Sequence, residues 1–465
     1  MHSSNGVTPL TEAMIASFPA VDPHVHVPGT ISPQTAWDLG LRNGLIHMKR
    51  NRQGKWEVID GPKSIGASDP VKQYSHIFTS KGGHELTFDK KGNPLALDYN
   101  YFCLPEQPDK FSGFDAIQGT TQGHRHRPGG IQTEDDYRFV MDRYLKSCLD
   151  QNITYVEPSQ NITISQVLYP ELPANDARSK FFQLAKQMVT HYAAHGVVLR
   201  FTHCANKTGA ANVPGSLKQR AHDWVDWLAQ AVAEVPGVFV GMTTAGHEGR
   251  EIESGGPDAM ADGYHRLKPL GLLGEGHYGE GAGVEHLDRA LECLSLDRLA
   301  HAVQMIESTA VLDKIRTRDI PIIMMPYINL SLGTTVHYKD GKPHSKYMND
   351  GFTRDPDVEK KYLQTLEEHP FFPLLREHHL PIALASDDPQ QGGIDYKDQV
   401  KLLAGLTYAF KPGFAPLSAE ELVICNLNAV HAAFCEPEVK THLIATIAQW
   451  TQAHALTVTH PLLTA

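Results

Sequence analysis

The chain alternates short apolar runs with longer amphipathic stretches. Eight apolar runs rich in β-branched residues predict strands over residues 21–27, 153–160, 197–204, 238–246, 272–280, 296–303, 320–329 and 380–388. Amphipathic segments between them, such as 134–150, 217–234 and 285–294, have the length of helices that pack on the outside of a barrel. The pattern therefore predicts an α/β protein with a (β/α)8 TIM-type barrel.

Two segments depart from this alternation. Residues 45–115 are rich in Gly, Pro, Lys and aromatic residues and contain short alternating pieces. We interpret them as an insertion with a hairpin that folds over the end of strand 1, and their basic excess favours a solvated loop face over an anion-binding lid. Residues 394–460 have a helical pattern throughout and should close the side or the bottom of the barrel. We expect residues 1–465 to form a single domain.

Composition narrows the class of protein. The 465 residues are 41% hydrophobic and 20% charged, which excludes disordered and disulfide-stapled chains. The formal net charge of -11 argues against a general binder of nucleic acid or anionic membranes, so we expect a small-molecule substrate, no nucleic acid and no membrane. The first twenty residues lack the pattern of a signal peptide, and the six cysteines include no C-x-x-C pair. A cytoplasmic protein with reduced thiols is predicted; its oligomeric state stays open, a homo-oligomer included.

Histidine is frequent, with 26 residues, and this directs attention to metal and acid–base chemistry. In a β/α barrel the catalytic groups come from the C-terminal ends of the strands. Ligand-type side chains stand at four predicted strand ends: His24 and His26, then His277 and Glu280, then His301, and finally Asp387 and Asp388. Alternation places the imidazoles of His24 and His26 on the same face of strand 1. Three histidines and one carboxylate suit a borderline-soft divalent ion such as zinc, and the remaining groups suit hydrolysis.

Each of these motifs has a structural alternative when it is taken alone. An H-x-H pair also occurs on surfaces and in cores, and Asp-Asp-Pro is a common turn. A second pair, His124 and His126, is interleaved with arginines such as Arg125, so we interpret that loop as solvated or as a lid. His203, at the end of the third strand, fits a hydrogen-bonded structural role better than a pocket contact. The joint placement of the other motifs at strand ends favours one shared site.

Several motifs resemble those of the adenosine deaminase-like branch of the amidohydrolase superfamily. HVHVPGTISPQT resembles its strand-1 motif, HYGE its H-A-G-E motif, RLAHAV its R-x-G-H-G motif and SDDP its T-D-D-P motif. TTAGHE, YVEPS and FSGFDAI resemble its L-A-G-x-E, Y-V-E-x-R and F-L-x-x-F segments. The likeness runs from residue 18 to 440, apart from the insertion. It implies a metal-dependent hydrolase with one zinc ion per chain, held by His24, His26, His277 and Asp387.

The resemblance also implies roles in catalysis and substrate binding. Glu280 is the implied proton donor to the ring nitrogen, His301 steers the attacking hydroxide, and Asp387 takes part in proton transfer. Asp388 is implied to bind the purine N7, and Gly246 and His26 are the other implied substrate contacts. General chemistry agrees, because zinc lowers the pKa of bound water from 15.7 towards about 7, and a glutamic acid in a dry pocket can protonate a ring.

Some positions depart from the family pattern. Nucleoside deaminases have an aspartate for the ribose 5'-hydroxyl where this chain has Pro28. Residues 157–159 (Glu-Pro-Ser) replace a motif with arginine, His247 stands where an acidic residue is common, and Ala302 replaces glycine. We expect all of these positions near the mouth of the pocket. A changed substrate and neutral variation of barrel loops both stay open as explanations.

The sequence leaves three functional hypotheses. The first is a zinc-dependent hydrolytic deaminase of a 6-aminopurine or a related amino-heterocycle, which releases ammonia. The second is a mononuclear amidohydrolase that cleaves a cyclic amide or ester; the usual binuclear form requires a modified lysine at the end of strand 4, which TTAGHE lacks. The third is a non-catalytic binding protein, which would be expected to have lost a ligand or the acid. Since every one of those residues is present, deamination is favoured.

Overall fold

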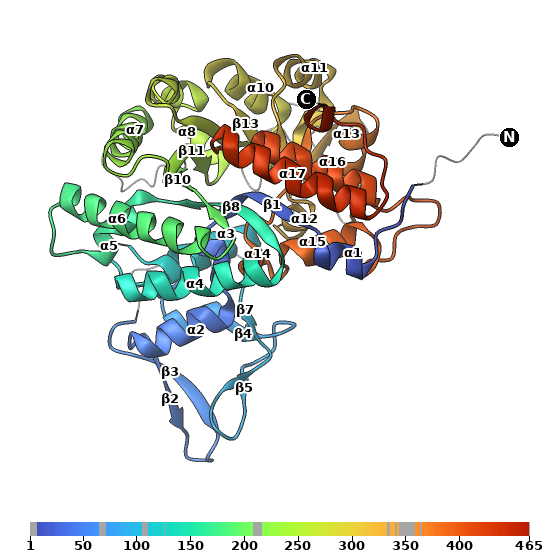
Figure 1. The fold of residues 1–465 in the computed structure, drawn as a ribbon. Helices are drawn as coiled ribbons and strands as arrows, with labels where there is room; N and C mark the ends of the chain where they lie inside the picture. Colours follow the sequence, from blue (N-terminus) through green and yellow to red (C-terminus); the bar gives the residue numbers. More distant parts are fainter. Residues whose placement is uncertain are drawn as a thin grey trace.

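The computed structural model describes residues 7–64, 71–104, 110–124, 126–207, 216–332, 335–339, 342–343, 359–362 and 365–464. Its centre is a parallel sheet with helices packed around it (Figure 1). The strands follow one another in chain order: β1 (Ala20–His26), β8 (Ile153–Gln160), β10 (Phe201–Asn206), β11 (Phe239–Ala245), β12 (Leu273–Tyr278), β13 (Arg298–His301), β14 (Ile322–Met324) and β18 (Ile382–Leu384). The short strand β9 (Val198–Leu199) pairs with β8. The predicted TIM-type barrel is confirmed.

The first strand and the segment after the last strand meet, and this contact closes the ring. Val25 and Asp387 form an isolated parallel bridge. His26 N donates to Asp387 O at 2.8 Å, and Asp387 N donates to His24 O at 3.1 Å. The closure brings residues from both ends of the chain side by side where the parallel strands end, the position at which barrel enzymes carry their active sites.

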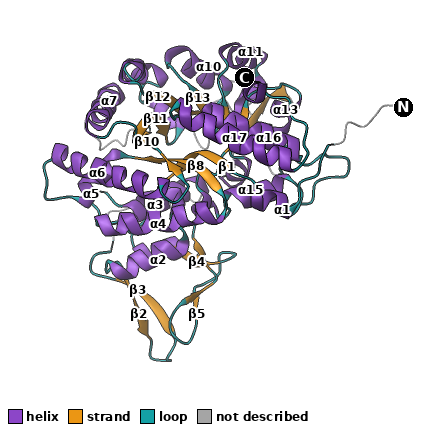
Figure 2. Ribbon diagram, viewed as in Figure 1, coloured by secondary structure: helices purple, strands orange, loops and turns teal. Residues whose placement is uncertain are grey.

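Helices connect the strands and cover the outside of the barrel (Figure 2). The three helices expected at 134–150, 217–234 and 285–294 are confirmed as α4 (Glu134–Asp150), α7 (Leu217–Glu234) and α10 (Val284–Cys293). Other described helices are α1 (Glu12–Ser17), α2 (Pro33–Arg42), α3 (Lys110–Gln122), α5 (Ser165–Leu168), α6 (Ala174–Ala193), α8 (Glu248–Glu253), α9 (Ala261–His265), α11 (Thr309–Arg318), α12 (Pro326–Leu332), α13 (Phe371–Arg376), α14 (Pro389–Gly392), α15 (Tyr396–Leu403), α16 (Ala419–Ala432), α17 (Pro437–Ala453) and α18 (Pro461–Thr464).

The seventh barrel strand is shorter than the sequence pattern predicts. The apolar run 320–329 was expected to be one strand, but β14 covers only Ile322–Met324 and α12 begins at Pro326. Proline has no backbone N–H for a sheet ladder and is well suited to the first turn of a helix. Asn329, which contacts residues of the candidate site, therefore lies on a helix and not on a strand.

The C-terminal segment is helical with one interruption. α15, α16 and α17 lie within the predicted range 394–460, whereas residues 404–418 form turns and extended chain. Pro412 and Pro416 in that stretch lack the N–H that a continuous helix requires. Asn426 of α16 accepts from Val21 N and donates to Pro19 O, both at 2.9 Å. This helix therefore packs against the start of β1, at the barrel end opposite the strand C-termini.

The insertion contains hairpins, and it folds over the barrel only in part. β2 (Ile46–Arg50) pairs with β3 (Trp56–Asp60), β4 (Phe78–Ser80) with β7 (Leu97–Tyr99), and β5 (Thr87–Phe88) with β6 (Pro94–Leu95). The β2–β3 hairpin projects away from the barrel beyond α2 (Figure 1). The later part of the insertion turns back to the barrel. The Tyr99 hydroxyl donates to Ile31 O at 2.7 Å, and the Tyr101 hydroxyl donates to Gln391 O. The expected cover over the end of strand 1 is thus made by the later part alone.

No helix among the described residues has both the length and the apolar composition needed to cross a bilayer.

All six cysteines are free thiols, in agreement with the expectation from their spacing. The largest buried side chains, among them Trp37, Tyr137 and Phe181, lie in one continuous core.

Helix α4 begins with a capping box. The Thr133 side chain accepts from Asp136 N at 3.2 Å, and Asp136 Oδ2 accepts from Thr133 N at 3.0 Å. Because the Thr133 side chain satisfies a backbone donor in the first turn of the helix, we expect Thr133→Ala to lower the free energy of unfolding by about 1 kcal/mol in chemical denaturation. Thr441→Ala, on the exposed side of α17, should stay within about 0.5 kcal/mol of the native chain. Equal losses in the two variants would contradict the assignment.

Candidate metal centre

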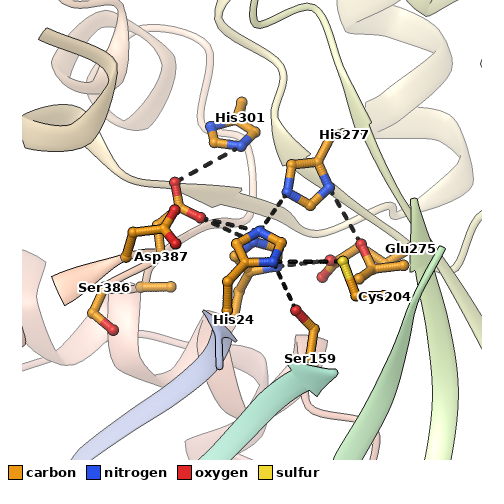
Figure 3. A network of polar contacts seen from close by, with 12 residues as sticks. His24, Ser159, Cys204, Glu275, His277, His301, Ser386 and Asp387 are labelled. Carbon is orange, nitrogen blue, oxygen red and sulfur yellow. Dashed lines mark hydrogen bonds and ion pairs between the residues drawn. The ribbon is translucent and has the colours of Figure 1, made fainter. Parts of the chain in front are cut away.

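The predicted ligand side chains meet inside the barrel, where its strands end. His24 and His26 lie on β1, His277 lies on β12, and Asp387 follows β18. All four are buried, and the most exposed of them is His26 at 7%. Alternation along β1 directs both of its imidazoles inward, as expected from the sequence. Figure 3 shows His24, His277 and Asp387 facing one another.

The distances between these ligand atoms fit one small cation. His24 Nε2 and His26 Nε2 each lie 3.4 Å from Asp387 Oδ1, and His26 Nε2 lies 3.0 Å from His277 Nε2. A tetrahedral zinc site with bonds of about 2.0–2.2 Å requires neighbouring ligand atoms about 3.3–3.6 Å apart. Three of the distances between these four side chains are thus close to those of a tetrahedral site.

Two buried atoms of this cluster are suited to bind a cation. Among the described residues, His24 Nε2 and Asp387 Oδ1 form no hydrogen bond, although both are buried and lie 3.4 Å from each other. A buried polar atom without a partner costs about 1–3 kcal/mol, and a bound cation would satisfy both atoms. Two groupings of ligand atoms lie within 4.8 Å of one another: His24, His277, His301 and Asp387, and also His26, Asp387 and Asp388.

Each of the three imidazoles on β1 and β12 is held through its Nδ1 atom. The contacts are His24 with Glu275 Oε1 at 2.7 Å, His26 with Ser159 Oγ at 2.9 Å and His277 with Thr243 Oγ1 at 3.3 Å. An imidazole that donates from Nδ1 presents the lone pair of Nε2 to a metal. The outer contacts thus fix which nitrogen faces the centre.

Glu280 and His301 form a second group beside the ligands. Asn329 of α12 donates from Nδ2 to Glu280 Oε1 at 3.3 Å and contacts His301 Nδ1 at 3.1 Å. His301 Nε2 lies 4.0 Å from Asp387 Oδ2 (Figure 3). Burial, reinforced by the negative charge of Asp387, raises the pKa of Glu280 to about 8. Glu280 is therefore a carboxylic acid at neutral pH, able to donate a proton.

Asp388 faces the same space from the other side. Its carboxyl group is buried, and this burial together with the charge of Asp387 raises its pKa well above the usual value. Gln118 of α3 donates to Asp388 Oδ1 at 2.7 Å. Gly29 packs so closely that an added Cβ would lie 2.0 Å from the same oxygen. Asp388 is thus held between the loop after β1 and the helix that follows the insertion.

The backbone at the site adopts unusual conformations. His301, Ala302 and Asp387 have φ values of 63°, 49° and 60°, in the left-handed region that residues with a Cβ rarely occupy. Such residues cost on the order of 1–3 kcal/mol each and cluster at functional sites. Ala302, the departure from glycine, therefore keeps a glycine-like conformation. Gly246, at the end of β11, has a φ of 104°, which requires glycine.

The other positions that differ from the family motifs lie at different depths in the barrel. Pro28 is buried in the short 3-10 turn that follows β1, and His247 begins α8 beside the ring of Phe111. Ser159 contacts the candidate ligand His26 directly. The expectation that Glu157 lies at the pocket mouth is wrong, because its carboxylate pairs with Arg298 Nη2 at 2.8 Å inside the barrel. Glu157 stands two residues before Ser159 on β8, so both side chains point into the barrel and Glu157 lies deeper.

The remaining histidines considered in the sequence lie away from the candidate metal centre. His203 is on the outer face of β10, against the rings of Trp224 and Trp227, and its Nδ1 accepts from Ile162 N at 3.3 Å. It is a structural residue, as favoured from the sequence. His124 and His126 are exposed and stand apart from the cluster, which fits a solvated loop; Arg125 between them lies outside the described residues.

Sequence reasoning missed several polar residues around the centre. They are Gln118, Thr243, Glu275, Arg298 and Asn329. One of them left a usable signal: Glu275 stands two positions before His277, so alternation puts both on the inner face of β12. Gln118 and Asn329 come from helices whose approach to the site depends on the whole fold, so no local pattern marks them.

The comparisons with known proteins bear on this arrangement. No family model matches the chain. The adenine deaminase of Hahella chejuensis is 24% identical over 199 residues, 43% of this chain and 48% of that protein. The adenine deaminase of Vibrio parahaemolyticus is 20% identical over 452 residues, 95% of this chain and 99% of that protein. The chain thus aligns with about half of the first relative and nearly all of the second.

The chain is thus similar in sequence to curated adenine deaminases. The resemblance inferred from the motifs is confirmed, and these relatives support a hydrolytic deaminase. Two solved structures share the fold at 16% sequence identity. The adenine deaminase of Arthrobacter aurescens has a TM-score of 0.59 over 94% of this chain and 100% of its own. An amidohydrolase from Burkholderia ambifaria, solved with bound zinc, has a TM-score of 0.62 over 97% and 96%.

Proposed function

We propose that the protein is a zinc-dependent aminohydrolase that converts a 6-aminopurine, or a related amino-heterocycle, and water into the oxo product and ammonia. The observation that carries this proposal is the joint placement of four ligand-type side chains, a protonated Glu280 and Asp388 around one buried point. Deaminase relatives that align with the chain, and the zinc in a protein of the same fold, support it.

In this proposal one zinc ion is held by His24, His26, His277 and Asp387. Three of the distances between their ligand atoms, 3.4, 3.4 and 3.0 Å, are close to those around a tetrahedral ion, and two of the atoms form no hydrogen bond. When bound, zinc would act as a Lewis acid that makes water a good nucleophile at neutral pH. The chain itself contributes a dry environment and fixed imidazole orientations.

Glu280 is assigned the task of breaking the aromaticity of the ring. Its raised pKa keeps the proton on the carboxyl group, from which it can pass to the ring nitrogen next to the attacked carbon. Asn329 fixes this carboxyl group and the His301 imidazole relative to each other. His301 and Asp387 are assigned two tasks: they accept the proton of the attacking water, and they transfer it to the departing amino group. The amino group then leaves as ammonia.

Three residues are proposed to contact the heterocycle of the substrate: Asp388, Gly246 and His26. A protonated Asp388 could donate to a ring nitrogen such as N7, in keeping with its raised pKa. Gly246 has a φ of 104°, a backbone conformation that favours glycine, and its lack of a side chain would let a flat ring approach the backbone. The side chain of Pro28 offers no acceptor for a ribose hydroxyl, which favours a free base or another ring over a nucleoside.

The remaining features of the proposal concern the whole chain. We take residues 1–465 as a single hydrolase domain that acts on a small molecule, with no nucleic acid or membrane partner. Six free thiols are in keeping with a reducing compartment, so we propose a cytoplasmic location. Association into a homo-oligomer is part of the same proposal and is measured by the mass of the protein in solution.

An ammonia-release screen tests the function. The zinc-loaded protein is offered free aminopurines, their nucleosides and nucleotides, pterins and triazines. We expect ammonia from one aminopurine class, with the free base ahead of its nucleoside because Pro28 replaces the ribose-binding residue. Release from cyclic amides or esters alone would favour the alternative amidohydrolase, and no turnover of any compound by zinc-loaded protein would contradict the proposal.

A further inference from the structure

Directly beneath the candidate metal centre lies a row of three buried charged side chains. Glu275 on β12, Arg298 on β13 and Glu157 on β8 point into the barrel, and none of them is more than 1% exposed. Charged groups buried this deeply are costly unless each is paired. The row is fully paired, and one end of it touches the centre.

The two oxygens of Glu275 have different partners. Oε1 contacts His24 Nδ1 at 2.7 Å, and Oε2 accepts from Arg298 Nε at 2.5 Å. Figure 3 shows Glu275 beside the histidine cluster. Because both oxygens are engaged, the carboxylate has one fixed position, and His24 has one fixed orientation.

Arg298 is itself held from several directions. Nη1 donates to Ala432 O and Nη2 donates to Pro23 O, both at 2.9 Å, while the Phe434 ring packs 3.7 Å from the guanidinium carbon. Pro23 is the residue before His24, so the same guanidinium fixes the backbone next to His24 and the carboxylate that contacts its ring. Glu157 Oε2 supplies the other charge partner at 2.8 Å.

His24 differs in this respect from the other two histidines. His26 and His277 have neutral hydroxyl groups at Nδ1, from Ser159 and Thr243. Of these three histidines, only His24 has an anionic partner at Nδ1. A carboxylate behind an imidazole fixes its orientation and raises its strength as a metal ligand more than a hydroxyl does. The row Glu275, Arg298 and Glu157 carries a net charge of about -1, which complements a divalent cation.

We infer that Glu275 is a positioning residue that sets the zinc affinity of the centre through His24, with Arg298 as the support that holds it in place. The inference rests on the proposed zinc site. It goes beyond that site in assigning to one outer carboxylate a measurable effect on zinc affinity, and in separating that role from the structural role of Glu157.

Zinc affinity, measured by competition with a chromogenic chelator, tests this inference without any enzyme assay. Glu275→Gln should raise the zinc Kd by about 10- to 100-fold, in the range found for outer-shell carboxylates. Glu275→Asp retains the charge but shortens the reach to His24, so it should also weaken zinc binding. It serves as the second variant if the glutamine form does not fold.

Glu157→Gln is the matched control. It removes the other carboxylate of the same arginine but leaves the contact to His24 intact, so its zinc Kd should stay within about threefold of the native value although its thermal stability falls. Native zinc affinity in a folded Glu275→Gln or Glu275→Asp protein, or an equal loss in Glu157→Gln, would overturn the inference. A native chain that binds no zinc would overturn both this inference and the proposed function. Expected Kd ratios without ammonia release from any substrate would leave the inference standing and refute the deaminase assignment alone.

Discussion

Glu280→Gln is expected to lower kcat for deamination by about 100- to 10,000-fold, the usual contribution of a general acid. Glutamine keeps the size of the side chain and the contact with Asn329, but it has no acidic proton to give to the ring. The zinc content of the variant should equal that of the native protein, because Glu280 is outside the proposed ligand set. Steady-state ammonia release with the best substrate measures the effect.

The pH profile supplies an independent readout for the same variant. A group with a raised pKa of about 8 is protonated below that pH, so native kcat/KM should fall as the pH rises through about 8. The residual rate of Glu280→Gln should lack this decline. Glu285→Gln, an exposed position in the first turn of α10, serves as the control and should retain native turnover. Native rates in Glu280→Gln would remove Glu280 from the mechanism.

The double variant His24→Ala, His26→Ala is expected to lose zinc and with it all measurable deamination. The native protein should contain about one zinc ion per chain by elemental analysis, and the variant essentially none, because two of four tetrahedral ligands are missing. Loss of this ion removes the source of the nucleophile, so the effect on turnover should exceed that of any substrate contact.

The second His-x-His pair of the chain provides a matched comparison. His124→Ala, His126→Ala makes the same two substitutions at exposed positions and should retain both the zinc and the activity. If the two double variants kept equal amounts of zinc, the ion would have to bind elsewhere. The comparison also separates loss of the ion from general destabilisation, since unfolding curves of both variants can be recorded in parallel.

The barrel was predictable because short apolar, β-rich runs recur along the chain with amphipathic segments between them. Strand β8 and the helices α4 and α7 begin and end at the predicted residues, since burial on both faces of a parallel strand and amphipathic packing of a helix leave strong periodic signals. The pattern was wrong for 320–329, where apolar residues continue past Pro326 from a strand into a helix. Apolar content alone does not distinguish those two elements.

The site was predictable wherever ligand-type residues alternate at strand ends. His24, His26 and His277 were found in this way, and they lie together. Depth inside the barrel leaves no comparable signal, which is why Glu157 was expected at the pocket mouth and the role of Arg298 was not anticipated. Asn329 and Gln118 reach the centre from helices, and their contacts depend on packing that only the folded chain defines.

The bridge between Val25 and Asp387 joins the beginning of the barrel to its end. A polypeptide still growing on the ribosome possesses the histidines of β1 long before the segment after β18 emerges. Until that segment docks against β1, the candidate metal centre lacks Asp387. The candidate metal centre can therefore form only after the chain has been synthesised at least as far as Asp387.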